Sequence, residues 1–234
     1  DVNANNRKDA RVVEHLVPDE KNLPPDWVKS LYARGEPAVY RGKESETIGM
    51  PVGGIGAGQL YLLGDGTLGC WQIFNKAHFT GYGETNYARR IPESPVDQGF
   101  AVRIRNEGMS TVVKLGREDF PDIEFDGRYP IGRVRYRRDD LPVDIDLEAF
   151  SPFIPLNAAD SALPATLFHV LLENNSENTA SVDVLGWLEN AVCIHSGETV
   201  AGLRRTRLVS EQGRSLVIHC AEEEVRKPGA DARP

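Results

Sequence analysis

The sequence predicts an all-β domain, an antiparallel β-sandwich with one short N-terminal helix. Three observations lead to this fold class. From residue 100 onward, short runs of alternating apolar and polar residues are separated by turn signals. The 22 Gly and 15 Pro among 234 residues favour a turn-rich chain. Good start and stop signals for a helix meet at one place, residues 25–34.

The N-terminal helix is predicted from its flanking residues. Pro24 stands at its start, Asp26 lies in its first turn, and Gly35 can cap its end. The rest of the N-terminal segment reads as extended. The predicted divisions are an extended lead with the helix (1–47), the β-sandwich (48–221) and a linker or truncated end (222–234).

Residues 48–75 contain the densest run of glycine in the chain. Four glycines within residues 53–58 predict a tight loop against which another segment packs closely, because glycine permits positive φ and close backbone approach. A strand is predicted over residues 59–63 and a second over 67–74. Asp65-Gly66 between them predicts a type I′ hairpin turn.

The same letters contain a G-x-G-x-x-G pattern at residues 64–69, which could indicate dinucleotide binding. Such a fingerprint must open a helix, whereas residues 70–74 have the composition of a strand. The hairpin turn explains these residues better than a nucleotide site does.

Further strands follow at turn-separated intervals. An irregular loop up to Gly99 comes first, and its length is typical of a functional or interfacial segment. The predicted strands lie at 100–105, 111–115, 133–138, 143–150, 165–173, 180–189, 203–210 and 215–221.

Two of these strands carry opposite charges at alternating positions. With a turn at residues 139–142, Arg135 is predicted to face Asp146, and the same register pairs Arg133 with Glu148 and Arg137 with Asp144. Tyr136 and Ile145 then point into the core. A solvated face of ion pairs is a better interpretation than a phosphate-binding patch.

The glycine loop and the second strand after it also resemble a known family. The letters PVGGIGAG at residues 51–58 and WQIFN at 71–75 are similar to the N-terminal domain of the bile-acid β-glucosidase (non-lysosomal glucosylceramidase) family of glycoside hydrolases. Later segments of the chain match this family in their order and spacing. They are SPFIP at 151–155 with Asp160-Ser161 and Pro164, LEN at 172–174, and Trp187 with Asn190.

This resemblance implies a supersandwich-like domain that braces a C-terminal (α/α)6 catalytic barrel. The parent protein would be a retaining β-glycosidase acting on a carbohydrate or glycolipid substrate. Its nucleophile and acid/base would belong to the barrel, so no catalytic residue is assigned here and the chain alone is expected to be inactive. No cofactor is expected. The alternative is a free-standing carbohydrate-binding or protein-interaction module.

Candidate interface or pocket-rim residues come from the two resembling segments. The loop glycines suggest close approach by another backbone segment, and Asn75 places an amide at the end of the second strand. Both features suggest a surface that meets the barrel. The alternative is that the glycines serve only packing inside this domain. These residues are Gly53, Gly54, Gly56, Gly58, Trp71 and Asn75. Weaker candidates for sugar contact are the loop aromatics Phe79, Tyr82 and Tyr87, whose alternative role is packing at a domain interface.

A metal site is not expected from the Cys and His residues. Cys193 and His195 can share a strand face, but His219 and Cys220 are adjacent and point to opposite sides, and neither pair has zinc-finger spacing.

Composition narrows the remaining partner classes. The net charge of −8 makes nucleic acid a poor partner, and no apolar run is long enough to span a membrane. Three Cys cannot form a disulfide framework, and the Asn174-Asn175-Ser176 sequon has meaning only in a eukaryotic secretory protein, so the compartment stays open. Because there is no initiator Met, we expect that the chain begins inside a longer precursor.

Overall fold

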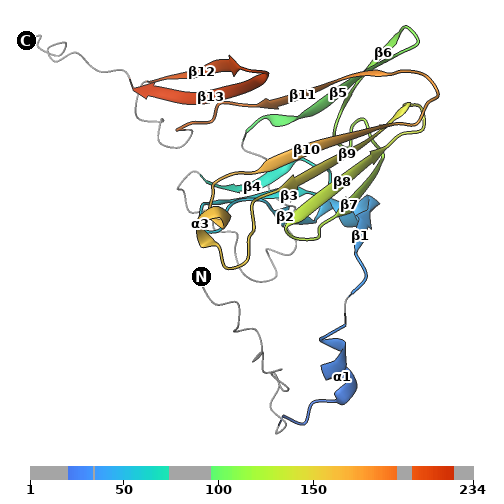
Figure 1. Ribbon diagram of the computed structural model, residues 1–234, viewed down its shortest axis with the longest axis vertical. Coiled ribbons are helices and arrows are strands. Elements are labelled where there is room, and N and C mark those ends of the chain that lie inside the picture. Colours follow the sequence, from blue (N-terminus) through green and yellow to red (C-terminus); the bar gives the residue numbers. More distant parts are fainter. Residues whose placement is uncertain (1–20, 34, 74–95, 194–201, 224–234) are drawn as a thin grey trace, which may run out of the picture. The chain divides into compact units, whose positions relative to one another are not determined.

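The computed structural model describes residues 21–33, 35–73, 96–193 and 202–223, and the structural statements below concern these residues (Figure 1). The chain divides between Pro37 and Ala38 into two units, the second of which contains every described strand.

The described part of the chain is all-β, as predicted, with short helices only. The elements are α1 (Pro25–Ser30), β1 (Val39–Arg41), the 3-10 helix η2 (Gly42–Glu46), β2 (Gly49–Pro51), β3 (Gln59–Leu63), β4 (Leu68–Gln72), β5 (Gln98–Asn106), β6 (Met109–Lys114), β7 (Asp122–Asp126), β8 (Ile131–Arg137), β9 (Val143–Phe150), α3 (Ala158–Ser161), β10 (Leu167–Asn174), β11 (Ser181–Leu188), β12 (Gly202–Glu211) and β13 (Arg214–Glu223).

The structure differs from the prediction at the short elements. The helix α1 ends at Ser30, four residues before the predicted end at Arg34. The prediction omitted β1, β2, β7, η2 and α3. Most of these are too short to show a period. In β7 the alternation is present, with Ile123 and Phe125 between acidic residues, but Asp and Glu are uncommon in strands.

The strands pair antiparallel throughout and form four sheets. A five-stranded sheet has the order β1-β7-β8-β9-β10, and two three-stranded sheets have the orders β2-β3-β4 and β11-β5-β6. The hairpin β12–β13 forms the fourth. Side chains from the first three sheets share one apolar core, which is the packing expected of a β-sandwich.

The centre of this core lies on one face of β8 and β9. Val134, Tyr136, Ile145 and Leu147 are fully buried, which confirms the predicted inward face of the hairpin. Tyr136 packs against Phe120 with ring centroids 5.2 Å apart, and its hydroxyl donates to the Asp65 carbonyl at 2.8 Å. This bond joins β8 to the turn between β3 and β4.

The predicted register of β8 and β9 is confirmed. Arg133 lies opposite Glu148, and Arg135 lies opposite Asp146. Arg133 forms an ion pair with Glu148, whose side chain is only 16% exposed. The charged face is therefore half-buried rather than solvated, which corrects the interpretation made from sequence.

The ion pairs on this face also extend to the neighbouring strand. Arg135 Nη1 lies 3.2 Å from Glu124 Oε2 on β7, closer than the 3.9 Å between Arg135 Nε and Asp146 Oδ2. Arg137 reaches Asp144 at 3.2 Å and Asp146 at 2.8 Å. Pairs linked across three strands hold β7, β8 and β9 in one register.

The turn at Asp65-Gly66 is not the predicted type I′ turn. That type needs positive φ at both central residues, whereas Gly66 alone has it here (φ 87°), in a three-residue loop closed by Leu63 N donating to Thr67 O at 2.8 Å. Paired positive φ values occur instead at Glu107-Gly108 and Gln212-Gly213.

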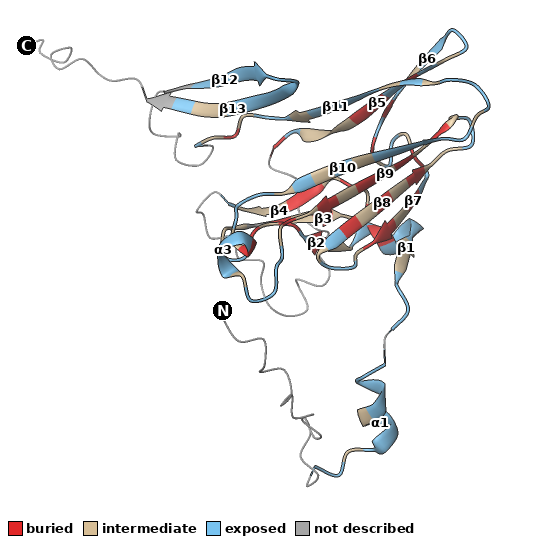
Figure 2. Ribbon diagram, viewed as in Figure 1, coloured by how far each residue is buried: buried red, intermediate tan, exposed pale blue. Residues whose placement is uncertain are grey.

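Burial is uneven among the hairpins. Figure 2 shows buried positions along β7, β8 and β9, whereas β12 and β13 are mostly exposed. In the β12–β13 hairpin, Leu208 faces Val217 and Val209 faces Leu216, and all four side chains are exposed. Because adjacent positions face opposite sides, this hairpin exposes apolar side chains on both of its faces.

Candidate functional site

The glycine loop at residues 53–58 packs against the segment that follows α3. A Cβ on Gly54 would lie 2.1 Å from the Leu163 carbonyl oxygen, so this position requires glycine. The Ile55 N–H donates to the Ser161 carbonyl at 2.9 Å and fixes the same approach. Gly54 therefore has a packing role inside the domain. Whether the loop also meets another domain stays a prediction.

The other loop glycines serve the backbone conformation. Gly56 and Gly58 have φ of 72° and 111°, values that L side chains rarely adopt. A Cβ on Gly58 would also lie 2.9 Å from the Ile73 side chain, beside the end of β4. The loop is thus held between α3 and the β4 end.

The segment before α3 is held by side-chain hydrogen bonds. Ser161 Oγ bonds both the N–H and the carbonyl of Ile154, at 2.9 and 3.1 Å. The Asn157 side chain accepts from the Asp160 N–H at 3.1 Å and caps α3. Leu156 between them has positive φ (66°) and a fully exposed side chain. A leucine in a left-handed conformation costs stability, and here its side chain makes no compensating burial inside the chain.

Exposed apolar side chains gather around this loop. Tyr129 and Phe153 form an edge-on pair with centroids 5.2 Å apart. We call the group the α3 patch, and it consists of Ile55, Tyr129, Phe153, Ile154, Leu156 and Leu163, each exposed. Clustered exposed apolar residues usually mark an interaction surface.

A second feature is a cavity of about 590 Å³ lined largely by aromatic and apolar residues. It lies among β4, β5, β10, β11 and the β12–β13 hairpin. We call it the aromatic cavity. Its lining residues are Leu68, Trp71, Gln98, Gly99, Phe100, Phe168, Gly186, Trp187, Leu188, Asn190, Thr206, Val217 and His219.

Two glycine–aromatic pairs orient rings in this cavity. Gly99 lies opposite Trp187 and Gly186 lies opposite Phe100 in the pairing of β5 with β11. A Cβ on Gly99 would lie 2.6 Å from the Trp187 ring, and one on Gly186 would lie 3.1 Å from the Phe100 ring. Each ring therefore covers the glycine across from it. The Trp187 indole N–H donates to Asp97 at 2.8 Å, which fixes the ring further.

Polar groups of the aromatic cavity come from β5, from the segment after β11 and from the β12–β13 hairpin. Asn190 donates to the carbonyls of Arg205 and Cys220, at 2.9 and 3.2 Å, and so fastens the β12–β13 hairpin. His219 Nδ1 lies 3.0 Å from Thr206 Oγ1, which leaves Nε2 for another partner. The Gln98 amide makes one long bond, 3.5 Å, from Nε2 to a carbonyl of β4.

The structure describes five of the predicted interface residues, Gly53, Gly54, Gly56, Gly58 and Trp71. Trp71 lines the aromatic cavity, but none of the four loop glycines does. Asn75, Phe79, Tyr82 and Tyr87 lie outside the described residues.

Sequence reasoning missed Gln98, Phe100, Phe168 and His219 as cavity residues. A signal was present in the two Gly-aromatic dipeptides, at 99–100 and 186–187. Antiparallel pairing places each aromatic residue opposite the other glycine.

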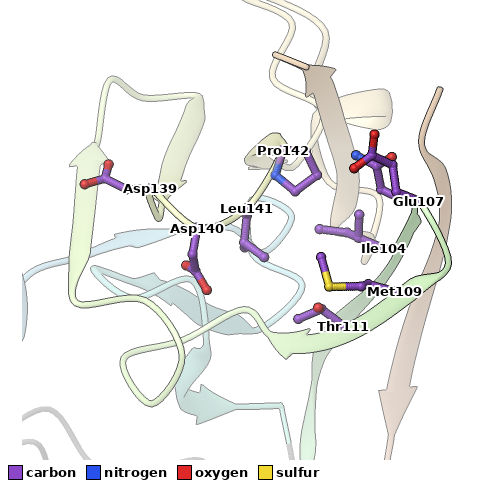
Figure 3. A pocket seen from close by; sticks show the side chains of 9 residues that line it. Ile104, Glu107, Met109, Thr111, Asp139, Asp140, Leu141 and Pro142 are labelled. Atoms are coloured by element: carbon purple, nitrogen blue, oxygen red, sulfur yellow. The ribbon is translucent and has the colours of Figure 1, made fainter. Parts of the chain in front are cut away.

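A smaller hollow of about 300 Å³ lies between the β5–β6 hairpin and the turn before β9 (Figure 3). Two of its acidic residues have partners: Glu107 accepts from Asn178 Nδ2 at 2.6 Å, and Asp140 pairs with Arg138. Figure 3 shows Asp139 and Asp140 on one side and Ile104, Met109 and Thr111 on the other. The charges of Glu107 and Asp140 therefore serve the fold.

Several carboxyl groups are held in the ionised form. Hydrogen bonds from Arg41 and Arg135, together with their charges, lower the pKa of Glu124. The Arg138 guanidinium lowers the pKa of Asp140, and that of Arg103 lowers the pKa of Asp183. A glycosidase general acid needs the opposite, a raised pKa.

The described part of the chain contains neither a metal site nor a membrane-spanning helix. No group of three His, Cys, Asp or Glu side chains among these residues could hold a metal ion. Cys220 Sγ donates to the Arg205 carbonyl at 3.3 Å, and His195 lies outside the described ranges. No helix in the described ranges has the length and apolar character that crossing a membrane requires.

Comparison with known proteins gives one family. The family model described as "beta-glucosidase 2, glycosyl-hydrolase family 116 N-term" matches residues 49–229. This match covers the glycine loop, the α3 patch and the aromatic cavity. A search among curated proteins found no match.

Proposed function

Because the chain belongs to the N-terminal domain family of glycosyl hydrolase family 116, we propose that it is the non-catalytic β-sandwich of a larger β-glucosidase. In this proposal it braces a C-terminal (α/α)6 barrel, and the parent hydrolyses a β-glucoside with retention, with a glucosylceramide-type glycolipid as one substrate. The glycine loop and the α3 patch form the docking surface.

The α3 patch is the observation that carries the docking role. Ile55, Phe153 and Leu156 expose apolar side chains on a backbone that hydrogen bonds and close glycine packing hold in place. A preformed apolar surface loses little conformational freedom on binding, so its burial contributes to affinity. Leu156 has a left-handed backbone conformation, which costs free energy, and burial of its side chain against a partner would offset that cost.

The carboxyl groups support a non-catalytic role. Retaining hydrolysis needs two carboxyl groups about 5–5.5 Å apart, one of them protonated at the start of the reaction. Glu124, Asp140 and Asp183 are instead kept ionised by arginine, and Glu148 is paired with Arg133. These side chains stabilise the sheets and are poorly placed to exchange protons with a substrate.

Activity of the purified chain tests the first part of the proposal. We expect no turnover of an aryl β-glucoside by this chain and steady turnover by the longer parent. Turnover by the chain alone that is abolished by substitution of one of its own acids would refute the proposal.

The substitution Leu156→Asn in the parent tests the docking surface. Asparagine tolerates the left-handed conformation, so the chain alone should keep or slightly raise its melting temperature. If Leu156 is buried at the interface, the parent should lose activity or be cleaved faster between its domains. Leu208→Asn, on the β12–β13 hairpin, is the matched control and should leave the parent unchanged. Equal effects of the two substitutions would remove the α3 patch from the proposal.

A second candidate is a free-standing carbohydrate-binding or protein-interaction module, which the aromatic cavity favours. The coding sequence beyond residue 234 discriminates between them. A few hundred residues of paired-helix pattern would support the bracing role, and a stop codon would support the module.

A further inference from the structure

We propose that the aromatic cavity is a binding site for a pyranose sugar of the β-glucoside type. Neither the family match nor the bracing role assigns this site. Its volume of about 590 Å³ falls within the range of small-molecule sites, about 300–1,000 Å³.

Aromatic faces in the cavity suit the flat surface of a sugar ring. In a β-glucopyranose every ring substituent is equatorial, so the ring C–H groups form two flat apolar faces, and such faces stack on Trp and Phe rings. Trp71, Phe100 and Phe168 pack against the core on one side and line the cavity on the other. Trp187 is fixed by its bond to Asp97. These rings are oriented before a ligand arrives.

Hydrogen-bonding groups in the cavity suit the sugar hydroxyls. A sugar needs donors and acceptors around its edge, and a cavity lined only by apolar groups would leave its hydroxyl groups unsatisfied. His219 can use Nε2, because Thr206 engages Nδ1. Gln98 has an amide that is only weakly committed, through its 3.5 Å bond to the Leu68 carbonyl. A few polar groups in an apolar lining are typical of a site that orients its ligand.

The simpler interpretation is that these aromatic residues only stabilise the sheets. Covering Gly99 and Gly186 explains the positions of Trp187 and Phe100. It does not explain why Trp71, from a different sheet, and His219, from the β12–β13 hairpin, line the same space. An aliphatic ligand would fit the apolar lining, but it would leave Gln98 and His219 without a role.

Tryptophan fluorescence of the purified chain tests the proposal directly. The chain has three Trp residues, and Trp27 lies in α1. In the Trp27→Phe background the signal comes from Trp71 and Trp187 alone, both of which line the cavity. Methyl β-D-glucopyranoside and cellobiose are the probes, glycerol is the polyol control, and hexanol is the apolar control.

We expect a saturable fluorescence change with the sugars, with a Kd of about 1 mM for a single sugar ring in a partly open site. Glycerol should give no saturable change. The absence of a saturable sugar response from the folded protein, or an equal response to hexanol that competes with the sugar, would overturn the proposal.

Substitutions that keep both tryptophans locate the site. Gln98→Ala and His219→Ala should each weaken sugar binding about twofold to tenfold, the loss of a neutral hydrogen bond. Leu216→Ala is the matched control on the opposite face of the same hairpin and should bind as tightly as the unsubstituted background. Thermal unfolding checks that each variant is folded. Unchanged affinity in both polar variants would place the ligand elsewhere and overturn the assignment.

The sugar class follows from the rings and polar groups of the aromatic cavity, not from the bracing role. Loss of the docking effect at Leu156 would leave sugar binding untouched, and absence of sugar binding would leave the docking experiment untouched. The two proposals can therefore fail separately.

Discussion

Two antiparallel hairpins of this chain differ in sequence pattern and in surroundings. In β8–β9, one face is fully buried and the other is a half-buried set of ion pairs. In β12–β13, the apolar side chains of both faces are exposed, including Leu208 at 68% and Leu216 at 57%. Both hairpins are antiparallel, and β12–β13 has the longer ladder.

The difference shows that antiparallel pairing forms a strand without deciding how deeply it is buried. β8 and β9 lie inside a five-stranded sheet, with β7 on one side and β10 on the other. The β12–β13 hairpin has no third strand among the described residues and is fastened through Asn190. A two-stranded ribbon gains little stability by itself, so its stability depends on what packs against it.

The largest expected effect comes from truncating the core of β8. Tyr136→Ala should lower the free energy of unfolding by about 3–5 kcal/mol, because it removes a buried ring and the bond to Asp65. Leu208→Ala in β12 should change it by less than about 0.5 kcal/mol. Urea unfolding of both variants measures the difference. Similar losses would mean that β12–β13 is buried as deeply as β8–β9.

The turn glycines give the next effect. Gly66 and Gly213 both have positive φ, but a Cβ on Gly66 would lie 1.7 Å from the Tyr136 hydroxyl, whereas Gly213 has open space around it. Gly66→Ala should therefore cost about 2–4 kcal/mol and Gly213→Ala about 1 kcal/mol. Thermal unfolding compares them. Adding Tyr136→Phe should recover part of the Gly66→Ala loss and none of the Gly213→Ala loss; no recovery would argue against the contact.

Removal of one ion-pair partner gives a smaller effect. Glu148→Gln leaves Arg133 without its half-buried partner and should cost about 1–3 kcal/mol, the range for hydrogen bonds to charged groups. Glu211→Gln, exposed on β12, should stay within about 0.5 kcal/mol. Denaturant melts at low and high salt should show the Glu148 difference persisting, because a half-buried pair is less screened. Equal behaviour of the two variants would show that burial does not strengthen the pair.

Lowering the pH is expected to give the smallest effect on stability. The Arg41 guanidinium lowers the pKa of Glu124 below its ordinary 4.5, so the folded state favours the ionised form. This contribution to stability is complete above about pH 4.5 and is lost as the pH falls through the lowered pKa. Glu124→Gln should therefore flatten the dependence of melting temperature on pH below about 4.5. An unchanged slope would exclude Glu124 as a contributor.

Sequence reasoning predicted the fold class and the centre of the sandwich because both depend on local alternation. The register of Arg135 with Asp146 followed from charge and turn length. The half-burial of that face was not predicted, because Glu124 comes from β7, a strand that the prediction omitted although Ile123 and Phe125 alternate with acidic residues.

The two surfaces of interest were predicted less well. Gly54 was identified as a position of close approach, but the segment that approaches it, Leu163, lies far along the chain. Trp71 was named without its neighbours, since the aromatic cavity draws on four sheets. Side chains brought together from distant strands carry no local periodicity, so single-sequence patterns cannot group them.

The pairing of β11 with β5 has a consequence for the order of folding. Strands β7, β8 and β9 are joined by short connections, β10 follows β9 after the segment that contains α3, and these four strands pair with their sequence neighbours. In contrast, Ser181 pairs with Arg105 and Trp187 with Gly99, which closes a long loop that encloses most of the five-stranded sheet. Loop closure of this kind slows folding. The local meander should therefore form early, and the sandwich should close only when β11 reaches β5.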